Sequence, residues 1–579
     1  DISSTDKGLL IPRMSTEERD AIATPAEGLM IYNTDDACFN YYTGSTCYKD
    51  CGRDLDTDKS LLPSITLGNS NSQTGNDVEV AADGSIYLAG RFRSNLSLGD
   101  TTLAYEGSFD LFLAYYDSEH TFQWVVALGG NNSDGGANIE CDPEGNVYLS
   151  AYFAGTMSLQ DTTVSSIGGE DVFLAKFNDQ GLLQWITTTG IDDEDYTYPG
   201  SLTLDEHNNL YIAASFQGSG TIGNSILNTS TNETNACLLK CNSNGVWQWA
   251  VQSDSDDDTY GYDVAVHEGS VYLVGSMDGL TAFGTDSYQN DDNNGFVARY
   301  DTSGNYLSSD ALKANDELAV YAVEVDNDGN YILGGYAYGD DINIGDSTTA
   351  IFDDYSLFVA KFDANQNLQW LTHQDNNESY VYDLAVDEDN HIYVAGTYRG
   401  TLTFGSTTVN SGVSVRDEIY ALKLTPDGQF VWIEVGNSND LDSEECFGIE
   451  LTTANTAYIA GTFQSTIDFT DLSFTANGST DAIFLQLNTE DGTQEVIDNS
   501  LDNSQDGDTD ATNEIQTLSK SGTTVTLSDG GGSFTDEVDD ADADNTNELQ
   551  TISKSGNTVT LSDGGGSFTD EVDDADSDD

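Results

Sequence analysis

The chain has 579 residues, enough for a large hydrophobic core and several domains. It carries 18 basic against 101 acidic residues, a formal net charge of −83. This charge excludes a nucleic-acid backbone as partner, because phosphate contacts need Lys or Arg, and it argues against docking on anionic lipid. Two interpretations of the charge stay open: solubility in salty surroundings, or a load of bound divalent cations. No apolar run reaches membrane-spanning length.

The composition favours an extracellular protein. Lys is scarce, Asn, Thr, Gly and Ser are abundant, and many short strands are expected. The chain begins at Asp1, without an initiator Met or a signal peptide, so we expect a processed protein or a fragment of a longer one.

Residues 1–60 are predicted to form a separate, small α+β module. Ser15 to Glu18 match a capping box, so a short helix should run through Ile22 and stop at Pro25. Leu29–Asn33 and Cys38–Tyr42 alternate as strands. A module of this length is too short to form a hydrophobic core alone. It must therefore pack on copies of itself or on the rest of the chain.

Three of the seven cysteines crowd this module, at positions 38, 47 and 51. We expect a disulfide between Cys38 and Cys47 across a hairpin; the spacing does not match a four-ligand zinc site. Cys237 and Cys241 lie four residues apart on a predicted strand, about 13 Å at roughly 3.3 Å per residue, which is too far to bridge. They are expected to be buried apolar side chains.

Seven tyrosines recur at spacings of 59–65 residues between about residue 61 and residue 497. Each follows an apolar strand and an Asp/Asn/Gly turn, and each is followed by further strands. A fixed period of this length predicts one four-stranded unit per repeat, and seven such units closed into a ring form a seven-bladed β-propeller in an all-β fold. The tyrosines are Tyr87, Tyr148, Tyr211, Tyr272, Tyr331, Tyr393 and Tyr458.

A second column of aromatic residues lies on the fourth strand of the repeats. It holds five of the six tryptophans, which we expect to anchor one blade on the next. The fourth repeat has Tyr306-Leu307 where the tryptophan is expected, and the seventh has Val496. The tryptophans are Trp124, Trp185, Trp249, Trp370 and Trp432.

The ends of the ring are also predicted to meet. Leu67-Gly68 lies one period, 61 residues, before Leu128-Gly129. The segment Ile65–Gly68 should therefore be the last strand of a blade whose other strands come from the far end of the repeats. Such pairing removes an open sheet edge.

Residues 498–579 hold two copies of a 34-residue unit, which begin at Asn513 and Asn547. The first copy predicts three short strands, at Ile515–Lys520, Val525–Leu527 and Phe534–Val538. Near-identical tandem units imply a stalk or filament, and the array is expected to continue beyond residue 579.

Acidic segments next to these units are candidate calcium sites. Alternating Asp residues followed by a Glu can wrap one hard cation, although the spacing is not that of an EF-hand. A solvated, flexible acidic linker is the alternative. The predicted structural Ca²⁺ ligands are Asp506, Asp508, Asp510 and Glu514, and Asp540, Asp542, Asp544 and Glu548.

The loops between the tryptophan strands and the next blades are rich in Asp and Asn, and they should cluster on one rim of the ring. Together with neighbouring tyrosines they could bind calcium or sugar hydroxyls; simple polar loops are the alternative. The candidate rim residues are Asp192, Asp193, Asp195, Tyr196, Asp256, Asp258, Tyr260, Asp375, Asn377 and Tyr380.

Catalysis has little support in the sequence. The five histidines share no register, and no nucleophile elbow, zinc-binding helix motif or phosphate loop is present. Acid pairs for glycoside hydrolysis are uninformative here, because among 101 carboxylates some must lie close by accident.

Two stretches resemble known families. The segment from DISSTDKGLL to NYYTGS, about 45 residues, looks like a module near the start of many surface and secreted proteins of gliding-type Gram-negative bacteria, and of some phage tail fibres. The Tyr and Trp repeats resemble the bacterial SBBP-type β-propeller repeat. These resemblances imply export across the outer membrane by type IX secretion.

The sequence thus favours a non-enzymatic protein of the extracellular bacterial cell surface, an adhesin or fibre subunit. Its N-terminal module would assemble copies of the chain, its propeller would present a face to a glycan or another cell-surface ligand, and its C-terminal repeats would form a calcium-stiffened stalk. Two alternatives stay open: a secreted propeller enzyme acting on polysaccharide, and a phage tail-fibre or receptor-binding protein.

Overall fold

The computed structural model describes residues 65–489, apart from short segments, and ten short strands outside that range. These residues contain no helix, and so no helix that could cross a membrane. The segments left out within the range are 68–71, 100, 192–197, 230–232, 291–292, 340, 345–346, 351–354, 375–377, 412–415, 439–443, 453–455, 471 and 478.

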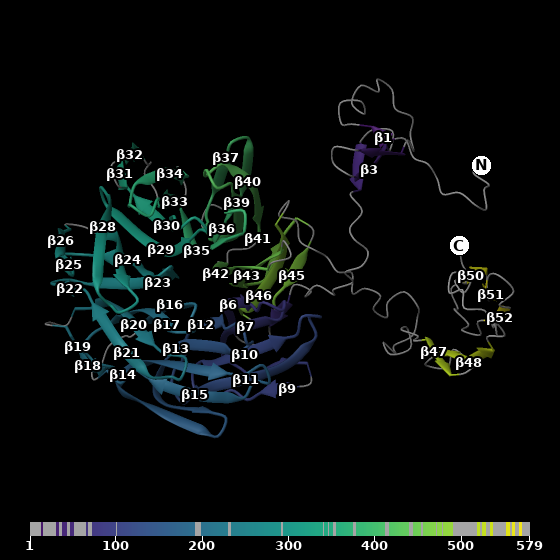
Figure 1. The fold of residues 1–579 in the computed structure, drawn as a ribbon, viewed down its shortest axis with the longest axis horizontal. Helices are drawn as coiled ribbons and strands as arrows, with labels where there is room; N and C mark the ends of the chain where they lie inside the picture. Colours follow the sequence, from purple (N-terminus) through teal and green to yellow (C-terminus); the bar gives the residue numbers. More distant parts are fainter. Residues whose placement is uncertain are drawn as a thin grey trace. The chain divides into compact units, whose positions relative to one another are not determined.

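Seven four-stranded antiparallel units follow one another around a common centre and form a β-propeller (Figure 1). Each unit begins with its inner strand and ends with its outer one.
The first unit has β6 (Gln73–Val80), β7 (Ile86–Phe92), β10 (Asp110–Tyr116) and β11 (Phe122–Gly130); the second has β12 (Gly135–Cys141), β13 (Val147–Leu159), β14 (Thr162–Phe177) and β15 (Leu183–Thr188).
The third has β16 (Tyr198–Leu204), β17 (Leu210–Phe216), β20 (Asn235–Cys241) and β21 (Trp247–Gln252); the fourth has β23 (Thr259–His267), β24 (Ser270–Met277), β27 (Asn294–Asp301) and β28 (Tyr306–Ala314).
The fifth has β29 (Glu317–Val325), β30 (Tyr331–Tyr338), β33 (Ser356–Phe362) and β34 (Leu368–His373); the sixth has β35 (Ser379–Val386), β36 (Ile392–Tyr398), β39 (Glu418–Leu424) and β40 (Phe430–Val435).
The seventh has β42 (Glu445–Leu451), β43 (Thr456–Phe463), β46 (Asp481–Asn488) and β5 (Ile65–Leu67).

Small hairpins connect the second and third strands of most units. In the second unit the ends of β13 and β14 form this hairpin themselves. Two further short strands, β22 (Asp254–Ser255) and β41 (Asn437–Ser438), pair with hairpins. The hairpins are β8 (Leu96–Leu98) with β9 (Thr101–Leu103), β18 (Ser219–Ile222) with β19 (Ser225–Asn228), β25 (Leu280–Phe283) with β26 (Asp286–Gln289), β31 (Asp341–Ile344) with β32 (Ser347–Ala350), β37 (Thr401–Phe404) with β38 (Thr407–Asn410), and β44 (Thr466–Asp468) with β45 (Ser473–Thr475).

The predicted ring closure is confirmed. Strand β5 lies antiparallel beside β46, and Leu67 pairs with Ala482 although the two are more than 400 residues apart. The core shows why this matters: Leu67 is buried with Phe484 of the seventh unit and Val78 of the first. Each unit is apolar on both faces and buries them against its neighbours, so the ring must close to cover the last face.

The column tryptophans anchor the first, second, third, fifth and sixth units on the units that follow them, as the sequence predicted. The indole N–H of Trp185 donates to the Ser243 carbonyl, 3.1 Å away, in the turn between the third and fourth strands of the following unit. Gly245 of the same turn lies against the indole face. The same indole-to-turn hydrogen bond recurs from Trp124 to Asp179, from Trp370 to Pro426 and from Trp432 to Thr489.

The tyrosine column needs one correction. Three of its members pair with a lysine on the third strand, and these pairs are Tyr148 with Lys176, Tyr211 with Lys240 and Tyr393 with Lys423. In the fifth unit the equivalent Lys361 pairs with Ile332, so Tyr331 lies one position earlier than predicted. Because side chains alternate along a strand, Tyr331 faces the preceding unit, where its ring centroid lies 5.2 Å from that of Tyr272.

The N-terminal module contains a four-stranded sheet of β1 (Arg13–Met14), β2 (Met30–Asn33), β3 (Cys38–Tyr42) and β4 (Cys47–Asp50). The two strands predicted from the sequence are confirmed as β2 and β3, while the predicted helix from Ser15 to Ile22 lies outside the described residues. The register pairs Cys47 with Tyr42 and Cys38 with Asn33. It does not place Cys38 opposite Cys47, and the disulfide between them stays a prediction.

The C-terminal repeats form two three-stranded sheets, one in each copy. This agrees with the three short strands predicted for each copy, within two or three residues at each boundary. The sheets consist of β47 (Leu518–Ser521), β48 (Thr524–Leu527) and β49 (Ser533–Thr535), and of β50 (Ile552–Ser555), β51 (Thr558–Leu561) and β52 (Ser567–Thr569). The predicted calcium ligands, from Asp506 to Glu514 and from Asp540 to Glu548, lie outside the described residues.

Candidate binding site in the central channel

The inner strands of all seven units are interrupted by a register shift at the same level of the ring. In the fourth unit it falls between Gly261 and Asp263, and in the sixth between Val381 and Asp383. A bulge sets two residues against one on the neighbouring strand, so two consecutive side chains can face the same side. Tyr262 and Asp263 accordingly both line the central channel.

Three aspartates at this level fasten neighbouring units together. The Asp263 carboxylate accepts the backbone N–H of Val264, at 2.7 Å, and that of Val323 in the next unit, at 2.6 Å. Two further aspartates make the same pair of bonds: Asp77 with Val78 and Ile139, and Asp383 with Leu384 and Ile449. These carboxylates thus satisfy amide groups of two neighbouring inner strands, which are edge strands of their sheets.

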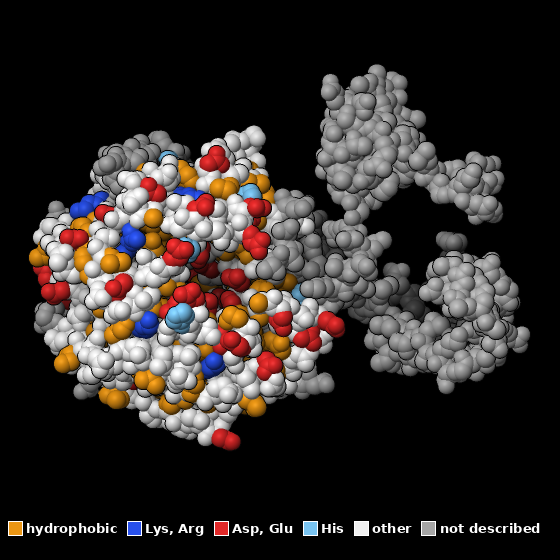
Figure 2. Space-filling view, viewed as in Figure 1, with side chains coloured by type: hydrophobic (Ala, Val, Ile, Leu, Met, Phe, Trp, Pro, Cys, Tyr) orange, Lys and Arg blue, Asp and Glu red, His pale blue; other side chains and the backbone are white. Residues whose placement is uncertain are grey.

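The channel encloses a cavity of about 240 Å³. Aromatic side chains line one side of it, and small or amide side chains such as Asn76, Gly200 and Ser201 line the other. Four glutamates also line this cavity: Glu79, Glu140, Glu324 and Glu450. Figure 2 shows acidic side chains inside the hollow at the centre of one face of the propeller.

The carboxyl groups of the channel have pKa values well above those of free Asp and Glu side chains. Burial raises the pKa of Asp77 and of Glu324 to about 7, that of Asp263 to about 6, and that of Glu450 to about 8. Repulsion between neighbouring carboxylates acts in the same direction. The described residues that line the cavity include no Lys or Arg, so no cationic side chain there offsets this repulsion.

The aromatic side of the cavity consists of four residues at equivalent positions in the fourth to seventh units: Tyr262, Tyr321, Tyr382 and Phe447. Their ring centroids follow one another at 5.0, 5.5 and 6.5 Å. Such separations are typical of attractive aromatic pairs. We call these four residues the aromatic wall.

Two of the predicted rim residues extend this wall. Tyr260 stacks on Tyr262, with centroids 6.2 Å apart, and Tyr380 stacks on Tyr382 at 6.1 Å. Asp258 accepts the Tyr260 hydroxyl at 3.2 Å, whereas the Asp256 carboxylate accepts the Leu280 N–H at 2.7 Å and so holds a hairpin. The other candidates lie outside the described residues: Asp192, Asp193, Asp195, Tyr196, Asp375 and Asn377.

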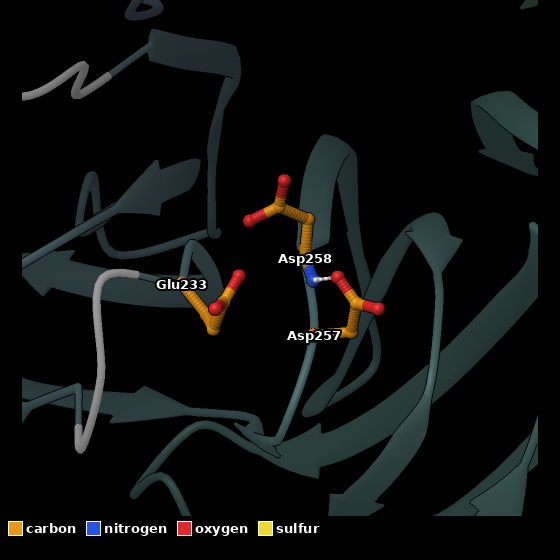
Figure 3. A group of neighbouring side chains, drawn as sticks. All are labelled: Glu233, Asp257 and Asp258. Atoms are coloured by element: carbon orange, nitrogen blue, oxygen red, sulfur yellow. Dashed lines mark hydrogen bonds between the residues drawn. The ribbon is translucent and has the colours of Figure 1, made fainter.

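Asp258 also belongs to a group of three carboxylates. One oxygen each from Glu233, Asp257 and Asp258 lies within 4.8 Å of the others (Figure 3). Asp258 is already engaged here, since it accepts the Thr234 N–H at 2.8 Å. Three carboxylates at this separation could hold a divalent cation, in line with the calcium alternative for the rim.

Sequence reasoning missed the aromatic wall itself. Its signal is present, because Tyr262, Tyr321, Tyr382 and Phe447 recur at spacings of 59, 61 and 65 residues. A strand of regular alternation would point either these residues or the ones that follow them into the channel, and not both. The bulge changes that alternation, and no composition signal marks it.

Comparison with known proteins gives one family match, at the start of the chain. Residues 1–74 match the model of the phage tail like trimerisation region. The match ends within β6, so it includes the closing strand β5.

A curated relative is the uncharacterized WD repeat-containing protein L264 of Acanthamoeba polyphaga mimivirus, 22% identical over 198 residues. The match covers 28% of this chain and only 14% of that protein.

Among solved structures, a polysaccharide lyase of family PL25, an ulvan lyase, is 10% identical, with a TM-score of 0.41 over 75% of this chain and 98% of the other. YCF48 bound to D1 peptide is 8% identical, with a TM-score of 0.34 over 73% and 97%.

Proposed function

We propose that the chain is a subunit of a homotrimeric extracellular fibre and that its propeller is a non-catalytic binding head, as in an adhesin. The match of residues 1–74 to a trimerisation region carries the proposal. The module is too short to form a core alone, which three copies packed together would supply. It leads directly into a propeller with an aromatic-lined channel.

Calcium belongs to the same proposal. The acidic segments from Asp506 to Glu514 and from Asp540 to Glu548 would bind Ca²⁺ at the repeat junctions and stiffen a stalk. Location at the bacterial cell surface and export by type IX secretion follow from the sequence resemblance and are proposed with it.

The family match also favours a second candidate, a receptor-binding subunit of a phage tail-like fibre. Both candidates need a trimer and a binding head, and they differ in the surface that the fibre is attached to.

The mass of the chain in solution tests the proposal. Light scattering on residues 1–579 should give three times the chain mass of 62.3 kDa at micromolar concentration. An Ile31→Asp variant, which puts a charge on β2, should shift the mass towards one chain while the propeller melts at the same temperature. A single-chain mass for the unaltered protein would contradict the proposal.

A further inference from the structure

The aromatic wall presents rings rather than hydroxyl groups to the cavity. The Tyr262 hydroxyl is held by the Ser276 hydroxyl, 3.0 Å away on the next strand. Tyr321 is hydrogen-bonded in the same way to Tyr336, and Tyr382 to Thr397. Because these hydroxyls are bound to residues behind the wall, the aromatic rings and not the hydroxyl groups line the cavity.

The opposite side of the cavity has smaller side chains and an unused acceptor. Gly200 and Ser201 stand there at the level where the wall has tyrosine and aspartate. The side-chain oxygen of Asn76 is buried there and has no hydrogen-bond partner among the described residues. An amide oxygen can only accept, so a guest that satisfies it must donate.

The remaining polar side chains of the cavity also favour a guest that donates hydrogen bonds. The channel carboxylates accept hydrogen bonds and repel one another, and no Lys or Arg is among the described residues of the lining. At the rim, Arg399 is already paired with Glu378 and with Asp417, 3.1 Å away. A guest carrying positive charge would offset a repulsion that the protein itself leaves uncompensated.

We infer that the cavity beside the aromatic wall binds an alkylammonium group carried by the ligand of the propeller. A cation over a tyrosine face is attracted by the ring quadrupole, an ammonium donates the hydrogen bond that Asn76 lacks, and the carboxylates supply charge. A bare metal ion fits less well, because it needs six or more oxygen ligands and four of the residues that line the cavity are aromatic. The inference rests on the proposed binding head and specifies its ligand.

Two sources of this chemistry can be separated, an amino sugar and a free polyamine. Titration calorimetry on the full chain would use the tetramer of β-1,4-linked glucosamine, its fully N-acetylated counterpart, and spermidine. Acetylation removes the charge and keeps the sugar rings, so the acetylated tetramer should bind at least about tenfold more weakly. Tighter binding of spermidine than of the glucosamine tetramer would assign the site to a polyamine.

Variants of the wall locate the binding. Tyr321→Leu and Tyr382→Leu should each weaken binding of the charged probe by about two- to thirtyfold. Tyr105→Leu is the matched control, since Tyr105 lies before β10 on the periphery and its hydroxyl bonds the Gly107 and Ser108 carbonyls. This control should leave the affinity unchanged. Equal binding of both tetramers, or wall variants that behave like the control, would overturn the inference.

A charge variant covers the case in which a wall variant fails to fold. Glu324→Gln keeps the shape of a channel side chain that can no longer become negative, and should weaken probe binding several-fold without loss of folding. Recovery of the glucosamine tetramer intact after incubation would agree with a non-catalytic head. A trimer that binds neither charged probe removes this inference alone, whereas a monomer that binds one removes the trimer alone.

Discussion

At the interface between two units, the size of the residue in the tryptophan position is matched by the turn residue that faces it in the following unit. Wherever a unit ends in a column tryptophan and the following turn is described, the residue facing it is glycine: Gly181, Gly245, Gly304 and Gly428. In the fourth unit the strand register puts Ser308 in the tryptophan position, and the facing residue is Gln366, whose side-chain amide donates to the Ser308 hydroxyl at 3.0 Å.

Glycine occupies these turns because the indole leaves no space for a side chain, and not because the backbone conformation requires it. Gly245 and Gln366 both have a positive φ, +77° and +69°. A Cβ on Gly245 would lie 2.7 Å from the Trp185 ring, whereas Gln366 faces only a serine. Arg299 restores part of the lost anchor, because it donates to the Ala364 carbonyl of the next unit at 3.0 Å. Tyr331 fills the interface from the other side.

This matching predicts a coupled pair of substitutions. Gly245→Gln should destabilise the propeller by about 3 kcal/mol, the sum of left-handed strain and a clash with the indole. In a Trp185→Ser background the clash is absent, so the same substitution should cost only about 1–2 kcal/mol more. Denaturant unfolding of the four proteins measures the difference. Equal costs in both backgrounds would show that the indole does not select glycine.

At the scale of the strands, the sequence predicted what depends on regular alternation. The four-stranded period, the tryptophan anchors and the closing strand Ile65–Gly68 all follow from apolar positions that repeat in register. What it could not predict depends on one-residue shifts. Tyr331 sits one position from its column, and the bulges before Asp263, Ala322 and Asp383 turn the wall tyrosines inward.

The carboxyl groups of the same inner strands predict how the stability of the propeller depends on pH. The pKa values of Asp77, Asp263, Glu324 and Glu450 are raised to about 6–8 by burial. A raised pKa stabilises the fold below the unfolded value, near 4, and that stability is lost as pH rises through the folded value. Asp142, Asp205 and Asp326, whose pKa values are lowered by hydrogen bonds, act only below this window.

We therefore expect the melting temperature of the propeller to fall as pH rises from 5 to 8.5, followed by calorimetry. Glu324→Gln should raise the melting temperature at pH 8 and flatten the profile, because it removes one of the four groups. Glu206→Gln, at an exposed turn, is the matched control and should change neither. A melting temperature that rises over this range would show that ionising the channel carboxyl groups does not destabilise the fold.

At the scale of the whole ring, the strand that closes the propeller also belongs to the segment that matches the trimerisation region. The trimerisation match runs through residue 74, so the proposed fibre attachment continues directly into β5. This strand has three described register pairs with β46, whereas the equivalent strands β10 and β11 of the first unit have six. We therefore expect the ring to open most readily where its two ends meet, at the strand that follows the proposed fibre attachment.

Hydrogen exchange can test whether the ring opens there. Amides of β46 should exchange faster than those of β10, and Leu67→Ala should speed exchange in β46 and β43 while leaving β17 and β20 on the far side protected. Leu128→Ala removes the same side chain at the equivalent place in the first unit. Both lose about 2–5 kcal/mol of core packing, but only the change at the closure frees a sheet edge. Faster opening in the Leu128→Ala protein would mean that the ends of the ring are held as firmly as its middle.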